Sequence, residues 1–476
     1  MKKGIDLSNL PSNWHVAELG NHLERIANGL TVTQNSEPPG LPVSRIETIS
    51  DGTINFDRVR YVQGLDREKQ KQFLLRQGDI LFSHINSDLH LGKTAVYSST
   101  HPLLHGMNLL LLRTRKETLH PYYLHYLLNY YRREGKFIEI AQHAVNQSSL
   151  NQKKIVSLPI PVAPPDQQQH IVAEIEKQFS RLDEAVANLK RVKANLKRYK
   201  AAVLKAAVEG KLTEDWRKQH PDVEPASKLL ERILAERRAK WSGRGKYKEP
   251  IELDTSALPK LPDSWAWVPW ESVLSPNEGA FKRGPFGSAL TKSIFVSQGY
   301  KIYEQYCPIN DDCSFGRYYI KPEKFEELRD FEVKPGDFLI SCSGVTLGRI
   351  TKVPRSSEKG IINQALLRVR LNGAVIQDAY FLYLFRSPVF QKRITDASTG
   401  TAIPNVKGVK ELKAIPISLP PLVEQPHIVA EVDRRLSVID ELEAAVEANL
   451  TRADRLRQSI LAHAFSGNLA CSEGVA

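Results

Sequence analysis

Two long stretches of the chain repeat apolar residues at steps of three and four. An apolar seam with a period near 3.5 that continues over about four heptads favours pairing of two helices over packing of each helix on its own domain. We therefore expect two long helices that pair as an antiparallel coiled coil. The expected packing positions are Ile175, Phe179, Leu182, Val186, Leu189 and Leu196 in the first stretch, and Val432, Leu436, Ile439, Leu442, Val446 and Ile460 in the second.

Proline and glycine mark the two ends of each predicted helix. Pro-Pro pairs at 164–165 and 420–421 come just before the seams, where proline fixes the start of a helix without disturbing its interior. Gly210 and Gly467 follow the last seam positions and are expected to end the helices. At 1.5 Å per residue, roughly 40 residues make a helix about 60 Å long.

The helical stretches are the best-matched part of a repeat that runs through the chain. At a shift of 257 residues, 158–212 aligns with 415–469 without a gap, so that LPIPVAPPDQQQHIVAEI matches IPISLPPLVEQPHIVAEV. Upstream segments match more loosely, as LPSNW at 10–14 matches LPDSW at 261–265. Solenoid units run roughly 20–50 residues, so this longer repeat indicates a duplicated domain pair about a pseudo-two-fold axis.

The region before each helical stretch has the pattern of a mixed α/β (α+β) domain. Short apolar runs such as GDILFSH, NLLLLRT and GDFLISCS predict strands, and PYYLHYLLNYYR and QDAYFLYLFRSPVF predict helices beside them. The Gly-Asp pairs at 78–79 and 336–337 are typical of tight turns into strands. The predicted organisation is a sheet-cored domain at 1–160, a helix at 161–212, a basic linker at 213–260, a second sheet-cored domain at 261–417, a second helix at 418–470 and a tail at 471–476.

Positive charge is concentrated in the middle of the chain. The net charge is +12 at pH 7; residues 190–218 hold ten Lys/Arg against three acids, and residues 228–248 hold eight against two. The linker is expected to contain a basic helix from about Pro225 to Trp241 and then a flexible stretch. A concentrated basic zone is equally compatible with a polyanionic partner, most often nucleic acid, and with a solvated helix face.

The chain lacks the residues that common catalytic motifs require. LGKTA at 91–95 resembles a phosphate loop, but Ser87 stands where that loop needs glycine. The loops that amino-methyltransferases use are missing, and the nuclease pattern PD…(D/E)-x-K fails because Ile175 replaces the required acid. We therefore expect no catalytic or metal site. No C-x2-C pair occurs among the four cysteines, which are Cys307, Cys313, Cys342 and Cys471.

Two histidines near the helix starts could suggest a metal site. His170 and His427 are followed four positions later by Glu174 and Glu431, and no third ligand is evident. A polar contact between residues four apart on a helix is the expectation we favour.

Taken together, these features resemble the specificity (S) subunits of type I restriction–modification systems. The two matched Pro-Pro segments look like the Pro-Pro-…-Glu-Gln-…-Ile-Val helix start of that family. LPDSWAWVPW, FKRGPFGSAL, KPGDFLISCSGVTLGR and the closing SGNL are further similarities. The order also agrees: target-recognition domain, helix, target-recognition domain, helix. The resemblance covers essentially the whole chain.

The resemblance implies a non-catalytic subunit that binds double-stranded DNA. Each recognition domain would read one half of a bipartite, asymmetric site, and the helices would set the spacer between the halves. Two methyltransferase (M) subunits would dock and supply S-adenosylmethionine for N6-adenine methylation. Two restriction (R) subunits would add translocation and cleavage that use ATP and Mg. No cofactor is expected on this chain itself.

The residues expected to contact DNA lie in predicted loops. Arg and Lys usually pair with guanine in the major groove, and Asn and Gln with adenine, although most such residues contact phosphate or solvent instead. The expected DNA contacts are Ser83, His84, Asn86 and Lys93 in the first domain, and Lys282, Arg283, Ser288, Lys292 and Arg349 in the second.

Other interpretations stay open at this point. The same plan would suit an orphan DNA-binding regulator, an antirestriction protein, a coiled-coil scaffold or an enzyme hidden in the variable halves. No apolar run approaches the roughly 18–20 residues that a membrane span needs, and the start, MKKGIDLSNLPSNW, has no apolar core typical of a secretory signal. We therefore expect a cytoplasmic protein without membrane contact.

Overall fold

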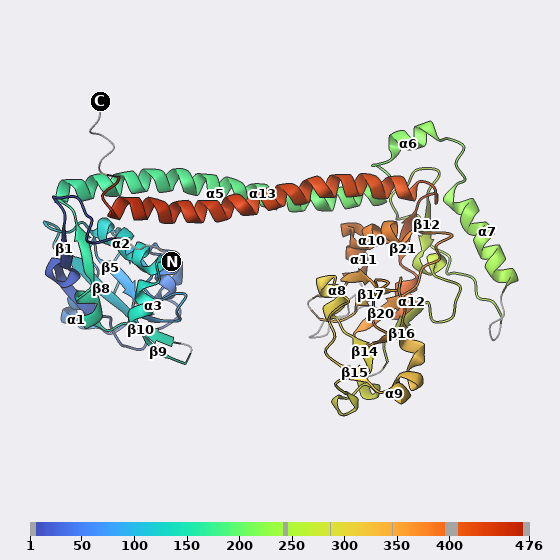
Figure 1. Ribbon diagram of the computed structural model, residues 1–476, viewed down its shortest axis with the longest axis horizontal. Coiled ribbons are helices and arrows are strands. Elements are labelled where there is room, and N and C mark those ends of the chain that lie inside the picture. The colour runs from blue at the N-terminus through green and yellow to red at the C-terminus, as the bar shows by residue number, and fades with distance from the viewer. Residues whose placement is uncertain are drawn as a thin grey trace. The chain divides into compact units, whose positions relative to one another are not determined.

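The computed structural model describes residues 6–145, 147–240, 246–285, 287–344, 346–395 and 408–469. The predicted tail at 471–476, with Cys471, lies outside the described residues. The chain divides into two compact units, one made of residues 1–191 with 446–476 and the other of residues 192–445. Two long helices, α5 (Pro165–Val208) and α13 (Gln425–Phe465), each contribute one part to each unit (Figure 1).

The first unit is built on an antiparallel sheet with strand order β2-β8-β5-β7. Small sheets β1-β11, β3-β4 and β6-β10-β9 surround it. Its strands are β1 (His15–Glu18), β2 (Leu23–Asn28), β3 (Leu41–Val43), β4 (Arg60–Val62), β5 (Ile80–Ser83), β6 (Ile85–Asn86), β7 (Thr94–Val96), β8 (Leu109–Thr114), β9 (Gln142–Ala144), β10 (Gln147–Ser149) and β11 (Pro159–Val162). Its shorter helices are α1 (Arg67–Phe73), α2 (Pro121–Arg133), α3 (Lys136–Ile140) and α4 (Gln152–Val156).

The second unit repeats this sheet as β13-β20-β17-β18. Its second sheet, β15-β14-β19-β16, corresponds to the pair β3-β4 of the first unit with the single bridges that join Val43 and Leu74 to Leu104. The pair β12-β21 corresponds to β1-β11. Its strands are β12 (Ala266–Pro269), β13 (Phe281–Arg283), β14 (Tyr300–Tyr303), β15 (Tyr319–Ile320), β16 (Glu332–Val333), β17 (Phe338–Ser341), β18 (Ile350–Lys352), β19 (Gly360–Ile362), β20 (Leu366–Val369) and β21 (Pro416–Leu419). Its shorter helices are α6 (Glu214–Gln219), α7 (Ala226–Ala239), α8 (Tyr306–Asn310), α9 (Pro322–Glu327), α10 (Asp378–Arg386), α11 (Pro388–Thr395) and α12 (Val409–Lys413).

The predicted mixed fold is therefore confirmed, and α7 falls within the predicted basic helix. In the first unit, α2 packs between the sheet and the long helices. The Tyr126 ring meets Phe179 of α5 edge-on, and the Tyr123 ring meets Phe465 of α13 in the same way. The start of α5 thus lies beside the end of α13, which makes the pair antiparallel within this unit. The last helix of the chain completes the core of the first domain.

Both units use the same ion pair to hold the long helices together. In the first unit, Arg457 of α13 pairs with Asp183 of α5. In the second, Lys200 of α5 pairs with Asp440 of α13 at 2.9 Å. Asp183 and Asp440 are 257 residues apart, and so are Lys200 and Arg457. The sequence repeat is therefore preserved as an equivalent contact in each unit.

Most of the predicted seam positions have buried or half-buried side chains. Leu182, Val186, Leu189 and Leu436 are half-buried. Leu442 is 48 % exposed, so its expected burial in the seam is wrong; Ile439 and Val446, one heptad apart, take the buried positions on either side of it. The buried positions are Ile175, Phe179, Leu196, Val432, Ile439, Val446 and Ile460.

A buried glutamine fastens each long helix to its domain. The Gln168 Oε1 accepts a hydrogen bond from the His120 amide at 2.8 Å, and its Nε2 donates to the carbonyls of Ala163 and Thr118 at 2.7 and 3.0 Å. Its counterpart in the repeat, Gln425, makes three equivalent hydrogen bonds. Both side chains are fully buried, and satisfying both ends of such an amide fixes how the helix sits on its domain. The partners of Gln425 are the Gln377 amide and the Pro420 and Val375 carbonyls.

Each long helix ends against the proline that opens a recognition domain. Gly210 and Gly467 have φ values of +76° and +82°, which favour glycine and end the helices as predicted. A Cβ at Gly210 would collide with Pro262, and one at Gly467 would collide with Pro11. At both helix ends, the close approach of a proline therefore leaves no room for a side chain larger than that of glycine.

We expect the first unit to lose stability in mild acid, while the second recognition domain does not. Burial lowers the pKa of His84, His105 and His125 to about 4, against about 6.5 in an unfolded chain. The unfolded state therefore takes up protons first as the pH falls below 6.5, and stability that is full above 6.5 is lost towards pH 4. Residues 261–417 contain no histidine.

Hydrogen exchange of the full chain at pH 7 and pH 5, corrected for intrinsic rates, measures this difference. Protection of β8 should fall, and protection of β20, its counterpart in the second unit, should stay nearly constant. Equal losses in the two strands would contradict the histidine explanation.

Candidate nucleic-acid interface

The residues that the structure describes do not gather into a catalytic or metal-binding constellation. No group of three or more His, Cys, Asp or Glu side chains among them could hold a metal ion. Cys307, Cys313 and Cys342 are free and buried. Among the described helices, none is both long enough and apolar enough to cross a membrane.

Side chains of the two His-Glu pairs contact neighbouring protein side chains. The Glu174 carboxylate accepts hydrogen bonds from Lys177 and Gln178 of its own helix. The Glu431 carboxylate accepts from two arginines of α13, which lower its pKa to about 2. His427 instead packs its ring on Trp216 of α6, with centroids 4.8 Å apart.

The repeated Gly-Asp turns also have a folding role, as expected. Asp79 lies just before β5 and accepts two hydrogen bonds from the Arg113 guanidinium, at 2.7 and 2.8 Å. Asp337 does the same with Arg370 in the second unit, at 2.7 and 3.0 Å. Each Asp is buried and ties two neighbouring strands of its sheet, so the pair stabilises the fold and leaves function to other residues.

The residues predicted to bind DNA in the first unit differ widely in exposure. Ser83 is fully buried at the end of β5, so its predicted DNA contact is wrong; its hydroxyl accepts a hydrogen bond from the Asn86 amide at 3.1 Å. His84 is half-buried and neutral at pH 7, because burial lowers its pKa to about 4. Lys93 is half-buried, and its Nζ donates to the Ser50 carbonyl at 2.6 Å.

In the second unit, the predicted residues lie on strand β13, on two short 3-10 helical turns and on the loop before β18. Lys282 pairs with Asp330 at 3.3 Å and lies over the Phe331 ring, so a protein contact already engages it. Arg283 is half-buried on the same strand. The remaining predicted residues are exposed to solvent, and they are Ser288, Lys292 and Arg349.

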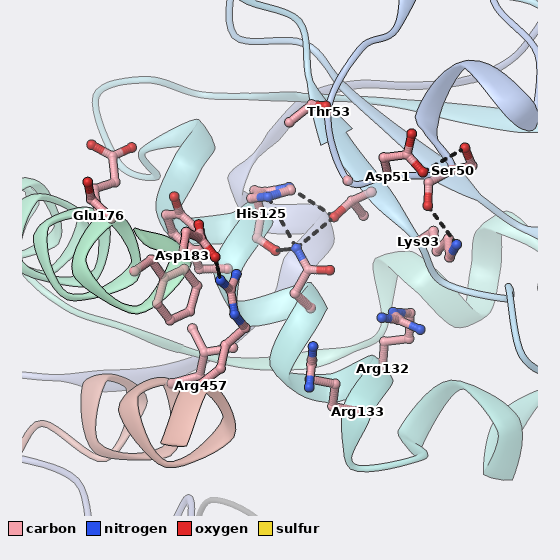
Figure 2. Close-up of a pocket in the computed structure, with 17 residues that line it drawn as sticks. Ser50, Asp51, Thr53, Lys93, His125, Arg132, Arg133, Glu176, Asp183 and Arg457 are labelled. Carbon is pink, nitrogen blue, oxygen red and sulfur yellow. Dashed lines mark hydrogen bonds and ion pairs between the residues drawn. The ribbon is translucent and has the colours of Figure 1, made fainter. Parts of the chain in front are cut away.

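A cavity of about 740 Å³ in the first unit collects basic side chains that include Lys93 (Figure 2). Arg132 and Arg133 enter it from the last turn of α2, and Arg457 enters from α13. Arg133 and Arg457 already pair with acidic residues of the unit. Figure 2 also shows the hydrogen bonds that join His125 to its neighbours in the cavity wall.

Within the described part of the chain, Lys93 and Arg132 are the cations of this cavity that lack an acidic partner in a direct ion pair. Burial, and then the field of Arg132, lowers the pKa of Lys93. Burial, and then the field of Arg133, lowers the pKa of Arg132, whose Nε has no hydrogen-bond partner among the described residues. Two cations that repel each other gain from a bound anion, and phosphate is the anion that a DNA-binding surface meets most often.

Two features of the candidate nucleic-acid interface in the first unit were not predicted from the sequence. Arg132 lies in NYYRREGK, where two arginines in the last turn of a predicted amphipathic helix could have drawn attention. The hairpin formed by β9 and β10 lies in QHAVNQSS, whose alternation of polar and small residues is too short to separate a strand from a loop.

Comparison with known proteins decides the family. The sequence model of the type I restriction modification DNA specificity domain matches residues 11–198 and 297–452. The chain belongs to this family. It is 31 % identical over 468 residues, or 98 % of this chain and 96 % of the relative, to a protein of Methanocaldococcus jannaschii provisionally named the MjaX type I restriction enzyme specificity subunit. It is 24 % identical over 97 % of its length to the EcoKI specificity subunit of Escherichia coli strain K12, of which it covers 90 %.

Solved structures of the family share the fold. One comes from work on complex assembly and conformational transition of the type I R-M system; it has a TM-score of 0.64 and 19 % identity, with 96 % of this chain and 99 % of that chain covered. Another is the HsdS subunit of Thermoanaerobacter tengcongensis, with a TM-score of 0.51, 18 % identity and coverage of 96 % and 98 %. The family assignment predicted from the repeated motifs is confirmed, and with it a role in DNA recognition.

Proposed function

We propose that this chain is the non-catalytic specificity subunit of a type I restriction–modification complex, with target-recognition domains at 1–160 and 261–417. Each domain would read one half of a bipartite, asymmetric site in double-stranded DNA. The long helices would set the spacer between the halves and dock two methyltransferase subunits. Two restriction subunits would complete the complex.

One observation carries this proposal: the two units share a frame but differ in their exposed surfaces. The fastening glutamines, the Asp–Arg sheet pairs and the helix ion pairs recur at equivalent positions. The half-buried Lys93 of the first unit corresponds to the exposed Arg349 of the second unit. A shared frame with different surfaces suits a protein that reads two different sequences in one geometry.

The chemistry would reside in the partner subunits. S-adenosylmethionine would supply the methyl group for N6-adenine methylation, and ATP with Mg would drive translocation and cleavage by the restriction subunits. This chain would contribute orientation and sequence choice through the predicted DNA contacts that lie at the surface, which include the exposed Lys292 and Arg349. Major-groove pairing with bases and charge pairing with phosphates are the two ways in which such side chains act.

Modified-base sequencing of the host genome tests this function. A bipartite N6-methyladenine motif with a fixed gap should be present in the parent strain and should disappear when the gene for this chain is deleted. Expression of the gene from a plasmid should restore it. A methylation pattern that is the same in all three strains would contradict the proposed function.

A further inference from the structure

We propose that the hairpin of β9 and β10 reads bases in the major groove, with Gln142 and Gln147 as the specificity-determining side chains of the first recognition domain. This inference rests on the proposed function. It names the element that reads one half-site and the base that it selects, which is adenine.

The hairpin presents both glutamines on one face. Gln147 pairs with Ala144 and Ser149 pairs with Gln142 in the antiparallel register. Because side chains of paired residues point to the same side and alternate along each strand, these four residues share a face. Gln142, Ala144 and Gln147 are exposed, and neither glutamine amide has a hydrogen-bond partner among the described residues.

The opposite face holds the hairpin in place. The His143 Nδ1 lies 2.8 Å from the Ser148 Oγ, and the His143 Nε2 lies 3.1 Å from the Ile138 carbonyl oxygen. The Ser148 hydroxyl also donates to Asp88, and β10 pairs with β6 through Ser148 and Asn86. Because the side-chain bonds lie on this face and the backbone of β10 pairs along its edge with β6, the glutamine face is held in a fixed position without being covered.

These residue types suit an A·T pair. A glutamine amide donates to N7 and accepts from N6 of adenine, and a two-stranded ribbon fits the width of the major groove. Ala144 between the glutamines leaves room for the base edges. Val145 at the tip is 92 % exposed, and nearby Leu89 is 75 % exposed; an apolar side chain in this position can contact a thymine methyl group.

Positive charge lies next to the hairpin. Lys153 of α4, which follows β10, is exposed. On the other side, the loop that carries Asp88 and Leu89 leads to Lys93, and the Leu89 carbonyl accepts a hydrogen bond from the Arg132 guanidinium at 3.5 Å. Base-reading amides between cations are the arrangement expected where phosphate contacts position the element that reads sequence.

Modified-base sequencing of strains that carry single variants tests the inference. Gln147→Ala and Gln142→Ala should each relax the base preference at one or two positions of a single half-site, by about tenfold for each lost bidentate contact. The other half-site and the gap should stay unchanged, and they report in the same experiment that the variant folds and assembles. Gln72→Ala, an exposed glutamine on α1 of the same unit, is the matched control and should leave the whole motif unchanged.

An unaltered motif in both hairpin variants would overturn the inference while leaving the proposed function intact. A change that appears in both half-sites would also overturn it, because the hairpin would then act on the whole complex. Absence of any bipartite motif in the unmodified strain would instead overturn the proposed function.

Discussion

Replacing Asp79 with alanine should destabilise the first unit by about 3–5 kcal/mol, because it leaves the buried Arg113 guanidinium with only the half-exposed Glu24 carboxylate, 3.9 Å from its Nη1, as an acidic partner. The Asp79 side chain is 1 % exposed and that of Arg113 is 9 % exposed. The carboxylate also accepts a hydrogen bond from the Arg76 amide at 2.8 Å. A typical domain has about 5–15 kcal/mol of stability, so this loss is a large fraction of the total.

Hydrogen exchange of the full chain gives the measurement and its internal control. Protection of β5 and β8 should fall sharply in Asp79→Ala, while protection of β17 and β20 in the second unit should not change. Asp79→Asn keeps an acceptor for the Arg76 amide and should lose less. Protection of β5 and β8 that equals the wild type in the alanine variant would show that the pair does not support the sheet.

The second large effect is expected at Glu424, which joins the linker to the rest of the second unit. Its carboxylate is fully buried and accepts hydrogen bonds from Thr213 at 2.6 Å, from Arg217 at 2.5 Å and from Trp265 at 2.8 Å. Glu424→Ala removes the carboxylate that accepts all three hydrogen bonds and leaves the mostly buried Arg217 guanidinium without an acidic partner, so a loss of about 3 kcal/mol is expected. The segment around α6 should then open more readily.

Trypsin digestion of the full chain detects this opening. Cleavage after Arg217 should accelerate on the order of 100-fold in Glu424→Ala if opening limits cleavage, since each 1.4 kcal/mol is tenfold. Glu424→Gln is the matched control, because the counterpart Gln167 naturally accepts from the Trp14 indole at 2.9 Å. The glutamine variant should keep the Trp265 bond and show a smaller effect; equal rates in all three proteins would refute the role of Glu424.

The frame of this protein could be predicted because it follows from local rules. The apolar period predicted the paired helices, and the proline and glycine signals bracketed them, as the φ values of Gly210 and Gly467 confirm. The gapless repeat predicted that the two units share contacts. These signals depend on residue spacing alone, which a single sequence contains in full.

The surface could not be predicted in the same way. Ser83 looked like a loop residue, but it ends a strand and is covered by its own sheet. Gln168 looked like one polar residue in a run of three glutamines, yet it is the fully buried one. Hydrogen-bonding side chains serve a fold or a partner equally well, and only their tertiary neighbours decide which. The hairpin glutamines were missed for the same reason.

The central claim is that two independent readers share one frame, and an exchange of one reader tests it most directly. Residues 261–417 would be replaced by the equivalent domain of a relative with a different methylation motif, and the host genome would be sequenced for modified bases. The account predicts that one half of the bipartite motif changes to that of the donor, while the other half keeps its sequence. A hybrid that methylates DNA but changes both halves, or changes neither, would contradict the account.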